Sequence, residues 1–355
     1  MSDSVKYTCG GDGRFLKWVA YLQIIGIVFV VLGHSFHEYP DGEMGHTTLL
    51  YRMMYSFRMP LFMFVSVFLM VYTTFSQGRC LPWRKFAQSK VKRLMVPFVV
   101  LSLITFVPRA LLSGIADDPV VLDIRSLAGS LVISGRSVIP FFWFLQASFT
   151  LLLVNYAVLL FANRRGWNQA YVYSVLILGF TLLPFVPIGC GHVFALGDAI
   201  RLGVFFVLGA AYAHSYRSVD RVIRWTSFAT VTFLAVCWIA AFFTTEGTDL
   251  SPLCSLLGIM MCVSVAKLLD RYSIGMLDHL IGANYIIFLL SWFCNVISQQ
   301  VLRHYTDMPW WVYSILSLFS GIYVPWWFYR YLQRHPDGRV AYLATHFFGQ
   351  SFRRR

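Results

Sequence analysis

Charged residues are scarce in this chain. They make up 13% of its 355 residues, whereas soluble globular domains typically contain about 25%. Polar stretches are also short, and none reaches the size of a separate soluble domain, about 50 residues or more. Hydrophobic residues make up 58% of the chain. This composition excludes an ordinary soluble enzyme and predicts an all-α, polytopic integral membrane protein.

Acidic residues are the scarcer of the two charge types. The chain has 16 Asp and Glu against 29 Lys and Arg, which gives a formal net charge of +13. A strongly basic balance can indicate nucleic-acid binding. In a membrane protein it instead reflects basic residues that are retained on the cytoplasmic side. We therefore expect membrane lipids, and no nucleic acid, among the partners.

Metal-ligand and targeting patterns are missing from the sequence. The seven cysteines show no CxxC or other metal-ligand spacing, so we expect neither a metal site nor a disulfide framework. The first residues lack the charged-then-apolar layout and the small-residue cleavage site of a signal peptide. The first apolar segment is therefore expected to stay in the mature protein as a transmembrane helix.

Ten apolar segments are long enough for transmembrane helices, which need about 20 residues each. They cover residues 17–37, 50–75, 93–114, 138–161, 169–188, 196–214, 222–244, 252–270, 279–302 and 309–331. We predict one membrane domain over residues 1–355, with a short cytoplasmic N-terminus (1–16), a helical core (17–331) and a basic cytoplasmic tail (332–355). Lys and Arg concentrate at the N-terminus, in alternate loops and in the tail. The positive-inside rule therefore places both termini in the cytoplasm.

His34 lies within the first apolar segment, in its expected outer half. A titratable side chain inside a membrane span is costly and is a functional-site candidate by default. Gln23 precedes it by eleven residues, about 16 Å along the same helix face. His37 and Glu38 follow on that face at i+3 and i+4. The stripe indicates a functional site, although interfacial polar residues and one hydrogen-bonded core histidine would give the same pattern.

Two further cations lie within apolar segments. Arg58 precedes Pro60, which removes a backbone donor and disturbs its helix, so Arg58 is placed either to satisfy freed carbonyls or to bind an anion. Arg201 lies three residues after Asp198, and an ion pair at this spacing would make Arg201 structural.

A basic segment enters the third span from the expected cytoplasmic side and contains Lys90, Lys92 and Arg93. Its basic residues retain the loop in the cytoplasm, and they could also bind the phosphates of a nucleotide-bearing cofactor. Trp143 belongs to an aromatic cluster that opens the fourth span. Such a cluster is typical of a membrane interface, and it could also line a pocket for a sugar ring or an acyl chain.

Several short motifs, taken together and in order, resemble the acyltransferase-3 family of integral membrane O-acyltransferases. The matching segments are Leu32–Ser35, Met59–Ser66, Lys92–Phe98, Trp143–Leu145, Arg201 with Phe205–Gly209, and Gly282–Leu290. They extend over most of the chain, from about residue 15 to 331.

The resemblance implies transfer of an acyl group, most often acetyl, from cytoplasmic acyl-CoA to a hydroxyl of a surface glycan or lipid-linked sugar. It implies a multi-pass protein of the bacterial cytoplasmic membrane, with the first-span histidine, here His34, as catalytic base. We expect Arg58 to stabilise the oxyanion and Glu38 to orient an imidazole. The expected donor-binding residues are Gln23, Lys90, Lys92, Arg93 and Arg201, and the expected acceptor-binding residues are His37 and Trp143.

The chain departs from the family pattern at three positions. Gln23 stands where the family usually has arginine or lysine, Arg58 where many members carry histidine, and Ser291-Trp292 where histidine often follows Leu-Leu. The alternatives are a glycan or glycolipid transporter or flippase, and an acyltransferase-like partner protein without activity. The sequence leaves the acceptor, the acyl chain and the oligomeric state open, a homo-oligomer included.

Overall fold

The computed structural model describes residues 16–36, 45–75, 80–111, 121–187, 189–216, 218–219, 226–245, 248 and 251–352. Every named element within these ranges is a helix, so the predicted all-α class is confirmed. The described residues form two compact units. The first contains residues up to Val65, then Tyr216–Ala341 and Phe352, and the second contains Ser66–Ser215 and Tyr342–Ser351.

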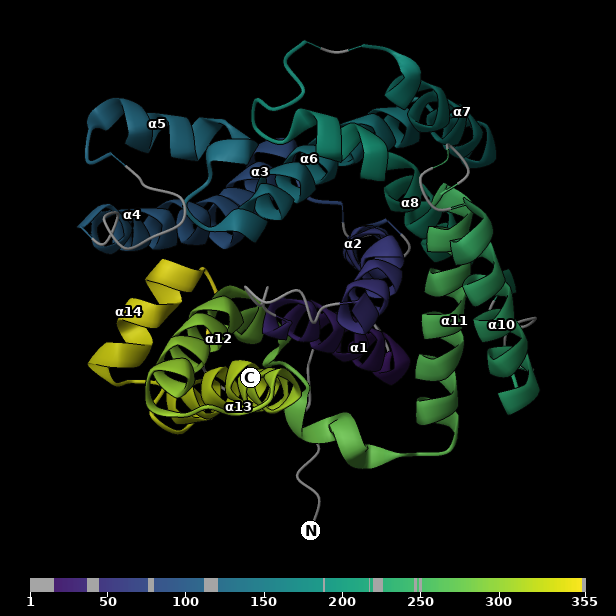
Figure 1. The fold of residues 1–355 in the computed structure, drawn as a ribbon. Helices are drawn as coiled ribbons and strands as arrows, with labels where there is room; N and C mark the ends of the chain where they lie inside the picture. Colours follow the sequence, from purple (N-terminus) through teal and green to yellow (C-terminus); the bar gives the residue numbers. More distant parts are fainter. Residues whose placement is uncertain are drawn as a thin grey trace. The chain divides into compact units, whose positions relative to one another are not determined.

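The first unit is built around the first helix, α1 (Lys17–Ser35). Its other elements are α2 (Gly45–Thr74) as far as Val65, α10 (Phe228–Thr245), α11 (Ser251–Arg271), η5 (Gly275–Leu280), α12 (Asn284–Tyr305), α13 (Trp310–Arg334) and the first residues of α14 (Arg339–Phe348). Helix α1 packs against α11, α12 and α13, while α10 pairs with α11 and α12 with α13 (Figure 1). An almost wholly apolar α1 is therefore enclosed on several sides.

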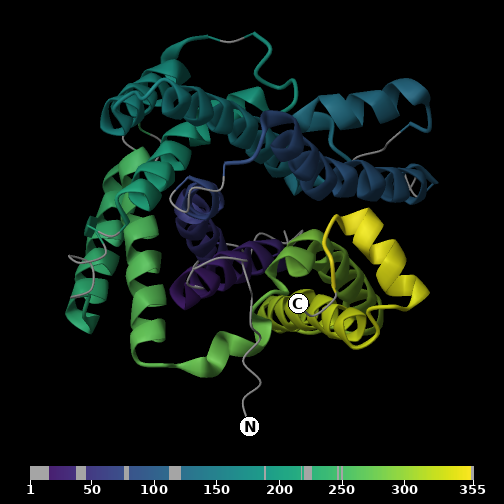
Figure 2. The ribbon, with the colours of Figure 1, turned by 180° about the vertical axis from the view of Figure 1, so that it is seen from behind.

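The second unit is formed by consecutive helices from the middle of the chain. After the end of α2 it contains α3 (Trp83–Lys90), η1 (Val91–Met95), α4 (Val96–Leu111), α5 (Ile124–Val132), η2 (Ser134–Arg136), η3 (Pro140–Phe142), α6 (Trp143–Arg164), α7 (Gln169–Leu182), η4 (Leu183–Phe185) and α8 (Leu196–His214), followed by α14 from Tyr342. Helix α8 packs against α6 and α7. Helices α3 and α4 continue into each other through the π-helical turn η1 (Figure 2).

Eight helices of the described chain are long and apolar enough to cross a membrane. They coincide with eight of the ten predicted spans. The fifth predicted span is a shorter apolar helix, residues 169–185. The tenth is α13, a 25-residue helix that carries Arg330 and Arg334 in its last turns. All ten segments are therefore helical, and the fifth and tenth are the ones that length and composition alone do not establish as spans.

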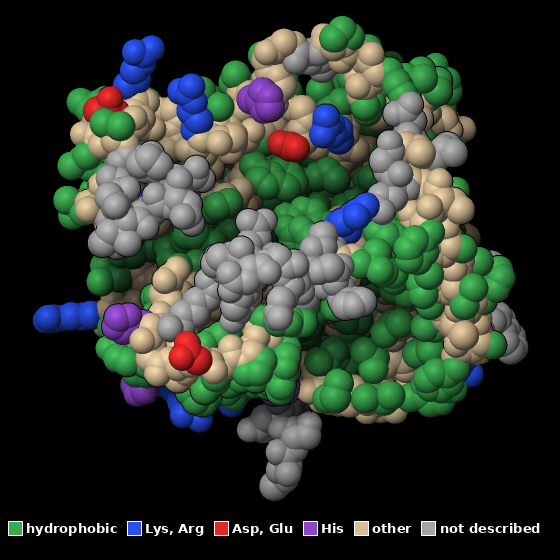
Figure 3. All heavy atoms as spheres, in the orientation of Figure 1, with side chains coloured by type: hydrophobic (Ala, Val, Ile, Leu, Met, Phe, Trp, Pro, Cys, Tyr) green, Lys and Arg blue, Asp and Glu red, His purple; other side chains and the backbone are tan. Residues whose placement is uncertain are grey.

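Large apolar side chains remain exposed on several of these helices, and hydrophobic atoms make up much of the face shown in Figure 3. On α10, for example, Phe228, Phe233 and Phe243 are each more than 60% exposed. Water disfavours such a surface, whereas lipid chains accept it. This exposure agrees with a polytopic membrane protein.

Candidate active site

His34 lies in the last turn of α1. The residue is half-buried, and its Nε2 atom is inaccessible to solvent. The helix ends one residue later, at Ser35, so its last carbonyl groups lack partners within the helix. Among them, the Ser35 carbonyl accepts a hydrogen bond from a side chain of another helix, and this helps to fix the turn that carries His34.

The side chains that bind this turn form a buried polar cluster from α1, α12 and α13. Asn295 Nδ2 donates to the Val31 carbonyl at 3.2 Å and to Ser35 Oγ at 3.3 Å. Gln299 Nε2 donates to the Ser35 carbonyl at 3.0 Å and to Ser317 Oγ at 3.1 Å. In an apolar environment such hydrogen bonds hold helices together at defined positions. The cluster therefore ties the end of α1 to both helices of the α12–α13 pair.

Arg58 of α2 lies directly against the residue before His34. Its guanidinium occupies the space where a side chain on Gly33 would begin, because a Cβ built on Gly33 would overlap Arg58 Nη1 and stand 3.0 Å from Cζ. Only glycine at position 33 permits this approach. The Gly33–His34 pair of α1 and the segment of α2 that begins at Arg58 thus meet in the first unit.

The guanidinium of Arg58 is fully buried, with an exposed fraction of 0%. Its Cζ lies 3.5 Å from the ring centroid of Tyr55 and 5.6 Å from that of Tyr51, so two aromatic faces stabilise the charge. None of the three guanidinium nitrogens makes a hydrogen bond of good geometry to a described residue, although the hydroxyls of Tyr51 and Tyr55 lie near enough to interact with the charge. Buried arginines are normally paired, and an unpaired one can receive an anionic oxygen.

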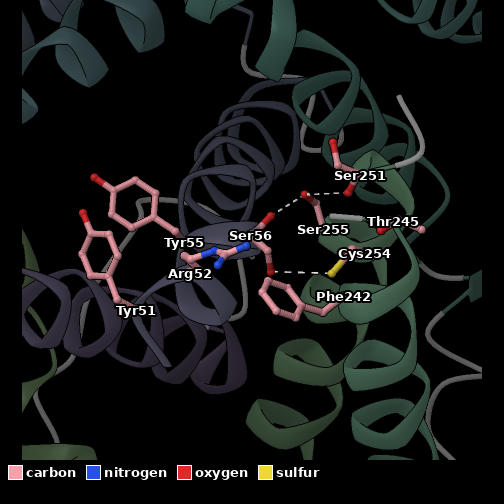
Figure 4. A pocket seen from close by; sticks show the side chains of 9 residues that line it. All are labelled: Tyr51, Arg52, Tyr55, Ser56, Phe242, Thr245, Ser251, Cys254 and Ser255. Atoms are coloured by element: carbon pink, nitrogen blue, oxygen red, sulfur yellow. Dashed lines mark hydrogen bonds between the residues drawn. The ribbon is translucent and has the colours of Figure 1, made fainter. Parts of the chain in front are cut away.

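A cavity of about 380 Å³ opens beside this centre, between α2, α10 and α11. It is lined by aromatic, hydroxyl-bearing, sulfur and basic side chains (Figure 4): Tyr51, Arg52, Tyr55, Ser56, Phe242, Thr245, Ser251, Cys254 and Ser255. Tyr55 belongs to both places, because the same side chain lines the cavity and covers the guanidinium of Arg58. The cavity volume lies within the usual range of small-molecule sites, about 300–1,000 Å³.

The predicted basic segment is found in the second unit. Lys90 is the last residue of α3, and Lys92 and Arg93 lie in the π-helical turn η1. Lys92 and Arg93 are exposed, whereas Lys90 is half-buried with its Nζ 5.0 Å from the Phe86 ring centroid. π-Helical turns occur often at functional sites.

The segment after α14 packs against this turn. Gly349 has a φ of +61°, and a Cβ on it would overlap the Lys92 carbonyl and stand 3.0 Å from Arg93 Cα. A residue larger than glycine would therefore disturb both chains.

The structure does not bring the remaining predicted site residues into contact with His34 or Arg58 within the described residues. Gln23 is half-buried on α1, and Trp143 is the first residue of α6 in the second unit. Arg201 is exposed on α8 and makes no ion pair with Asp198 within 4 Å, so the pairing that the spacing suggested is wrong. His37 and Glu38 lie outside the described residues.

Sequence reasoning missed Asn295, Gln299 and Tyr55 as neighbours of the candidate centre. A signal was present for two of them, because Asn295 and Gln299 are amides four residues apart within an apolar span and therefore share a helix face. Tyr55 offered no comparable signal, because a tyrosine near the expected outer end of a span is typical of any membrane interface.

The comparison with family models gives one match. A model described as an acyltransferase domain matches residues 16–330 of the chain. Searches of curated proteins and of solved structures returned no match.

Proposed function

Since this chain belongs to the acyltransferase-3 family, we propose that it transfers an acyl group, in the first instance acetyl, from acyl-CoA to a hydroxyl of a glycan or lipid-linked sugar. The observation that carries the proposal is the contact between Arg58 and the Gly33–His34 pair. It joins a proton acceptor and a fixed positive charge in a place that is shielded from solvent.

The reaction requires both groups. The acceptor oxygen attacks the carbonyl carbon of the thioester while His34 takes the hydroxyl proton, and a tetrahedral oxyanion forms. Its collapse breaks the carbon–sulfur bond, and the protonated imidazole returns the proton to the departing thiolate. The products are the acyl ester and free CoA. A general base of this kind contributes about 10²–10⁴-fold to the rate.

Arg58 is suited to the oxyanion. Its guanidinium has donors that no described residue uses, and its burial excludes water that would screen the charge. A donor that is already in position where negative charge develops is worth about 10²–10³-fold in rate. The guanidinium does not need to move during the reaction, because it is held between two contacts, one with Gly33 of α1 and one with the ring of Tyr55 of α2.

The donor's charged end would be held at the basic turn of the second unit. Lys92 and Arg93 are exposed there, within one turn of helix, and such side chains bind phosphate oxygens through charge-assisted hydrogen bonds. Gln23 of α1, in the first unit, is a separate candidate for donor binding, as a neutral hydrogen-bonding group. The positive-inside rule predicts that both termini are cytoplasmic. As a protein of the bacterial cytoplasmic membrane, it would therefore bind acyl-CoA from the cytoplasm.

The test uses purified full-length protein in detergent with radiolabelled acetyl-CoA and an oligosaccharide acceptor. His34→Ala and His34→Gln should each lose at least about 10²-fold in kcat. His335→Ala is the matched control, because His335 follows α13 and is exposed. Near-normal transfer by both His34 variants would overturn the proposed chemistry.

The same preparation separates the alternatives. A transporter or flippase would move the glycan in vesicles without consuming acetyl-CoA. A partner protein without activity would neither bind nor turn over acetyl-CoA in isolation. Either result in the wild-type protein would contradict the proposal.

A further inference from the structure

Helix α14 (Arg339–Phe348) is a ten-residue helix that follows α13 in the chain (Figure 1). It comes after residue 330, the last one that the family model matches, and the proposed reaction uses none of its side chains. At about 1.5 Å per residue the helix is about 15 Å long, half the thickness of the hydrocarbon core of a bilayer. Helix α14 is therefore too short to cross a membrane, and its role depends on what its faces meet.

The side chains of α14 form three stripes, each with the i, i+3, i+7 spacing of one helix face. The buried stripe consists of Ala341, Ala344 and Phe348. The apolar stripe is 42–49% exposed and consists of Val340, Leu343 and Phe347. The polar stripe is exposed and consists of Arg339, Tyr342 and His346. Because the apolar stripe lies between the buried and the polar one, α14 has the pattern of a helix that lies in a membrane interface.

The end of α13, the tenth expected span, indicates the level at which α14 begins. Trp327 and Tyr331 near this end are 65% and 48% exposed, and the last residue, Arg334, is exposed as well. Exposed Trp and Tyr beside basic residues are typical of the level of the lipid headgroups. The backbone N–H of Gly338 donates to the His335 carbonyl at 3.1 Å, so a tight turn connects the two helices. Helix α14 therefore begins close to the headgroups.

The charge of this part of the chain favours anionic lipids. From Arg330 to Phe348 there are three arginines and one aspartate, Asp337, so the formal charge remains +2 whichever group Asp337 contacts. The positive-inside rule places this end of α13 on the cytoplasmic side, where the leaflet carries a negative surface potential. Each basic residue near such a surface strengthens binding by about fivefold.

The apolar stripe is too small for a stable contact with another protein. A helix about 15 Å long and about 10 Å wide offers at most about 150 Å² on one face, whereas a stable protein interface buries about 800 Å² on each partner. Lipid needs no minimum area, because the rest of the protein is already held in the same membrane. The observations therefore favour a lipid surface over a second copy of the chain.

The other end of α14 is attached to the basic turn η1 within the second unit. The contact at Gly349 is made by backbone atoms, since a Cβ on this residue would overlap the Lys92 carbonyl. Backbone atoms cannot move aside as a flexible side chain can. The position of α14 therefore affects the turn that carries Lys92 and Arg93.

We propose that α14 is an interfacial helix that binds the anionic phospholipid surface of the cytoplasmic leaflet and thereby holds η1 in place. Its apolar stripe enters the boundary between headgroups and acyl chains, and Arg334 and Arg339 pair with lipid phosphates. Only the effect on acetyl-CoA rests on the proposed function, because lipid binding itself requires no donor.

Hydrogen exchange of the full-length protein tests the lipid contact, in nanodiscs that each contain one copy. Discs of phosphatidylcholine alone are compared with discs that also contain phosphatidylglycerol. The amides of α14 should exchange at least about fivefold more slowly when phosphatidylglycerol is present, and high salt should reduce this difference. Equal exchange in the two kinds of disc would overturn the proposal, and so would protection that appears only in discs with two copies.

Two double variants separate the apolar contact from the charge. Leu343→Gln with Phe347→Gln should speed exchange of α14 in both kinds of disc, because glutamine keeps the helix propensity but does not enter lipid. Arg334→Gln with Arg339→Gln should remove only the effect of phosphatidylglycerol. Ile124→Gln is the matched control, since Ile124 is 86% exposed at the start of α5.

Exchange of α14 that the apolar double variant leaves unchanged would contradict the lipid contact. A preference for phosphatidylglycerol that survives in the arginine double variant would contradict the assignment of the two arginines.

Transfer assays in the same discs distinguish this inference from the proposed function. In the apolar double variant, KM for acetyl-CoA should rise severalfold while kcat stays near the wild-type value, because η1 loses its support. An unchanged KM would contradict the link from α14 to η1. Lipid-dependent exchange without transfer in any disc would contradict the proposed function alone. Transfer together with equal exchange in the two kinds of disc would contradict this inference alone.

Discussion

Arg58 places a permanent positive charge where solvent does not reach it. Removing an ion from water costs several kcal/mol unless hydrogen bonds and an opposite charge compensate. Two tyrosine rings compensate in part, but among the described residues no hydrogen-bond acceptor meets the guanidinium. A side chain retained under such conditions is explained better by chemistry than by stability.

This explanation predicts that activity and stability respond in opposite directions to Arg58→Met. Transfer should fall about 10²–10³-fold because the oxyanion loses its donor. The midpoint of thermal unfolding in detergent should stay unchanged or rise, because an apolar side chain of similar length removes a buried charge. If unfolding shifts to a clearly lower temperature, Arg58 has a structural role instead.

Gly33 offers a second test at the scale of one residue. In Gly33→Ala the new Cβ would overlap Arg58 Nη1, so the guanidinium must move away from the turn that carries His34. We expect kcat to fall by about 10²-fold, as for loss of one oxyanion donor. Gly179→Ala is the control, because a Cβ there would meet no atom within 4 Å. Normal turnover by Gly33→Ala would separate Arg58 from the chemistry.

At the scale of the helix, α1 is defined by what holds its two ends. Its last carbonyls accept from Asn295 and Gln299 of α12. Its first turns are bound to η5, where Asp278 accepts from Lys17 Nζ at 3.0 Å and from Tyr21 Oη at 2.6 Å. The helix that carries His34 is therefore positioned by elements more than 250 residues later in the chain.

Gln299→Ala should weaken the attachment of the C-terminal end of α1 to α12. It leaves the Ser35 carbonyl and Ser317 without their shared donor, and interhelical hydrogen bonds in membranes are worth about 0.6–2 kcal/mol. We expect a lower midpoint of thermal unfolding and a lower kcat with an unchanged pH optimum. Gln300→Ala provides the matched control on the same helix, because Gln300 is exposed. Equal stability of the two variants would show that the cluster does not hold α1.

The attachment at Asp278 should depend on pH. Burial raises the pKa of Asp278, but hydrogen bonds from Tyr21 and Lys17 outweigh this effect and hold it below its usual range. Because the pKa is lower in the folded state, the stabilisation is present above the unfolded-state pKa, about 3.9, and is lost as the pH falls through the folded-state value. The ion pair is partly exposed, so it contributes less than about 1 kcal/mol.

The expected measurement is a small loss of stability in Asp278→Asn at pH 7 that disappears toward pH 3. Thermal unfolding of wild type and Asp278→Asn in detergent at several pH values gives the loss of stability at pH 7 and its change with pH. Asp307→Asn serves as the control, since Asp307 is exposed between α12 and α13. A difference between wild type and Asp278→Asn that grows at low pH would contradict the assigned sign.

For the whole molecule, the distribution of basic residues predicts the membrane orientation. With both termini in the cytoplasm, a phosphatase that is active only outside should be inactive when fused after Arg355 and active when fused near Asp307. The reason is the cost of translocating Lys and Arg, which the positive-inside rule expresses. Activity of the C-terminal fusion would reverse the orientation and exchange the expected donor and acceptor sides.

The helices were predictable to a large extent. All ten apolar segments are helical within the described residues, because lipid requires every backbone group to be bonded within its own segment. The boundaries shifted where polar residues extend a helix, as at Trp83, where helical structure begins ten residues before the expected start of the third span. His34 and Arg58 could also be chosen as candidates from the sequence, because ionisable side chains are rare in spans.

The neighbours of these residues were not predictable. The spacing of Asp198 and Arg201 suggested an ion pair that the structure does not form, because i,i+3 spacing permits a contact without requiring it. Tyr55 acquires its role only through the rotation of α2, which turns its ring onto Arg58 and into the cavity. Asn295 reaches α1 across a sequence separation of 264 residues.

The sequence by itself determined the membrane class, the helical segments and the two candidate side chains, since composition and local hydropathy act within single segments. Tertiary structure alone decided that Gly33 admits the Arg58 guanidinium, that α12 binds the end of α1, and that a cavity with Arg52 adjoins the centre. These are contacts between helices. They depend on how side chains pack across an interface, which the periodicity of one helix does not specify.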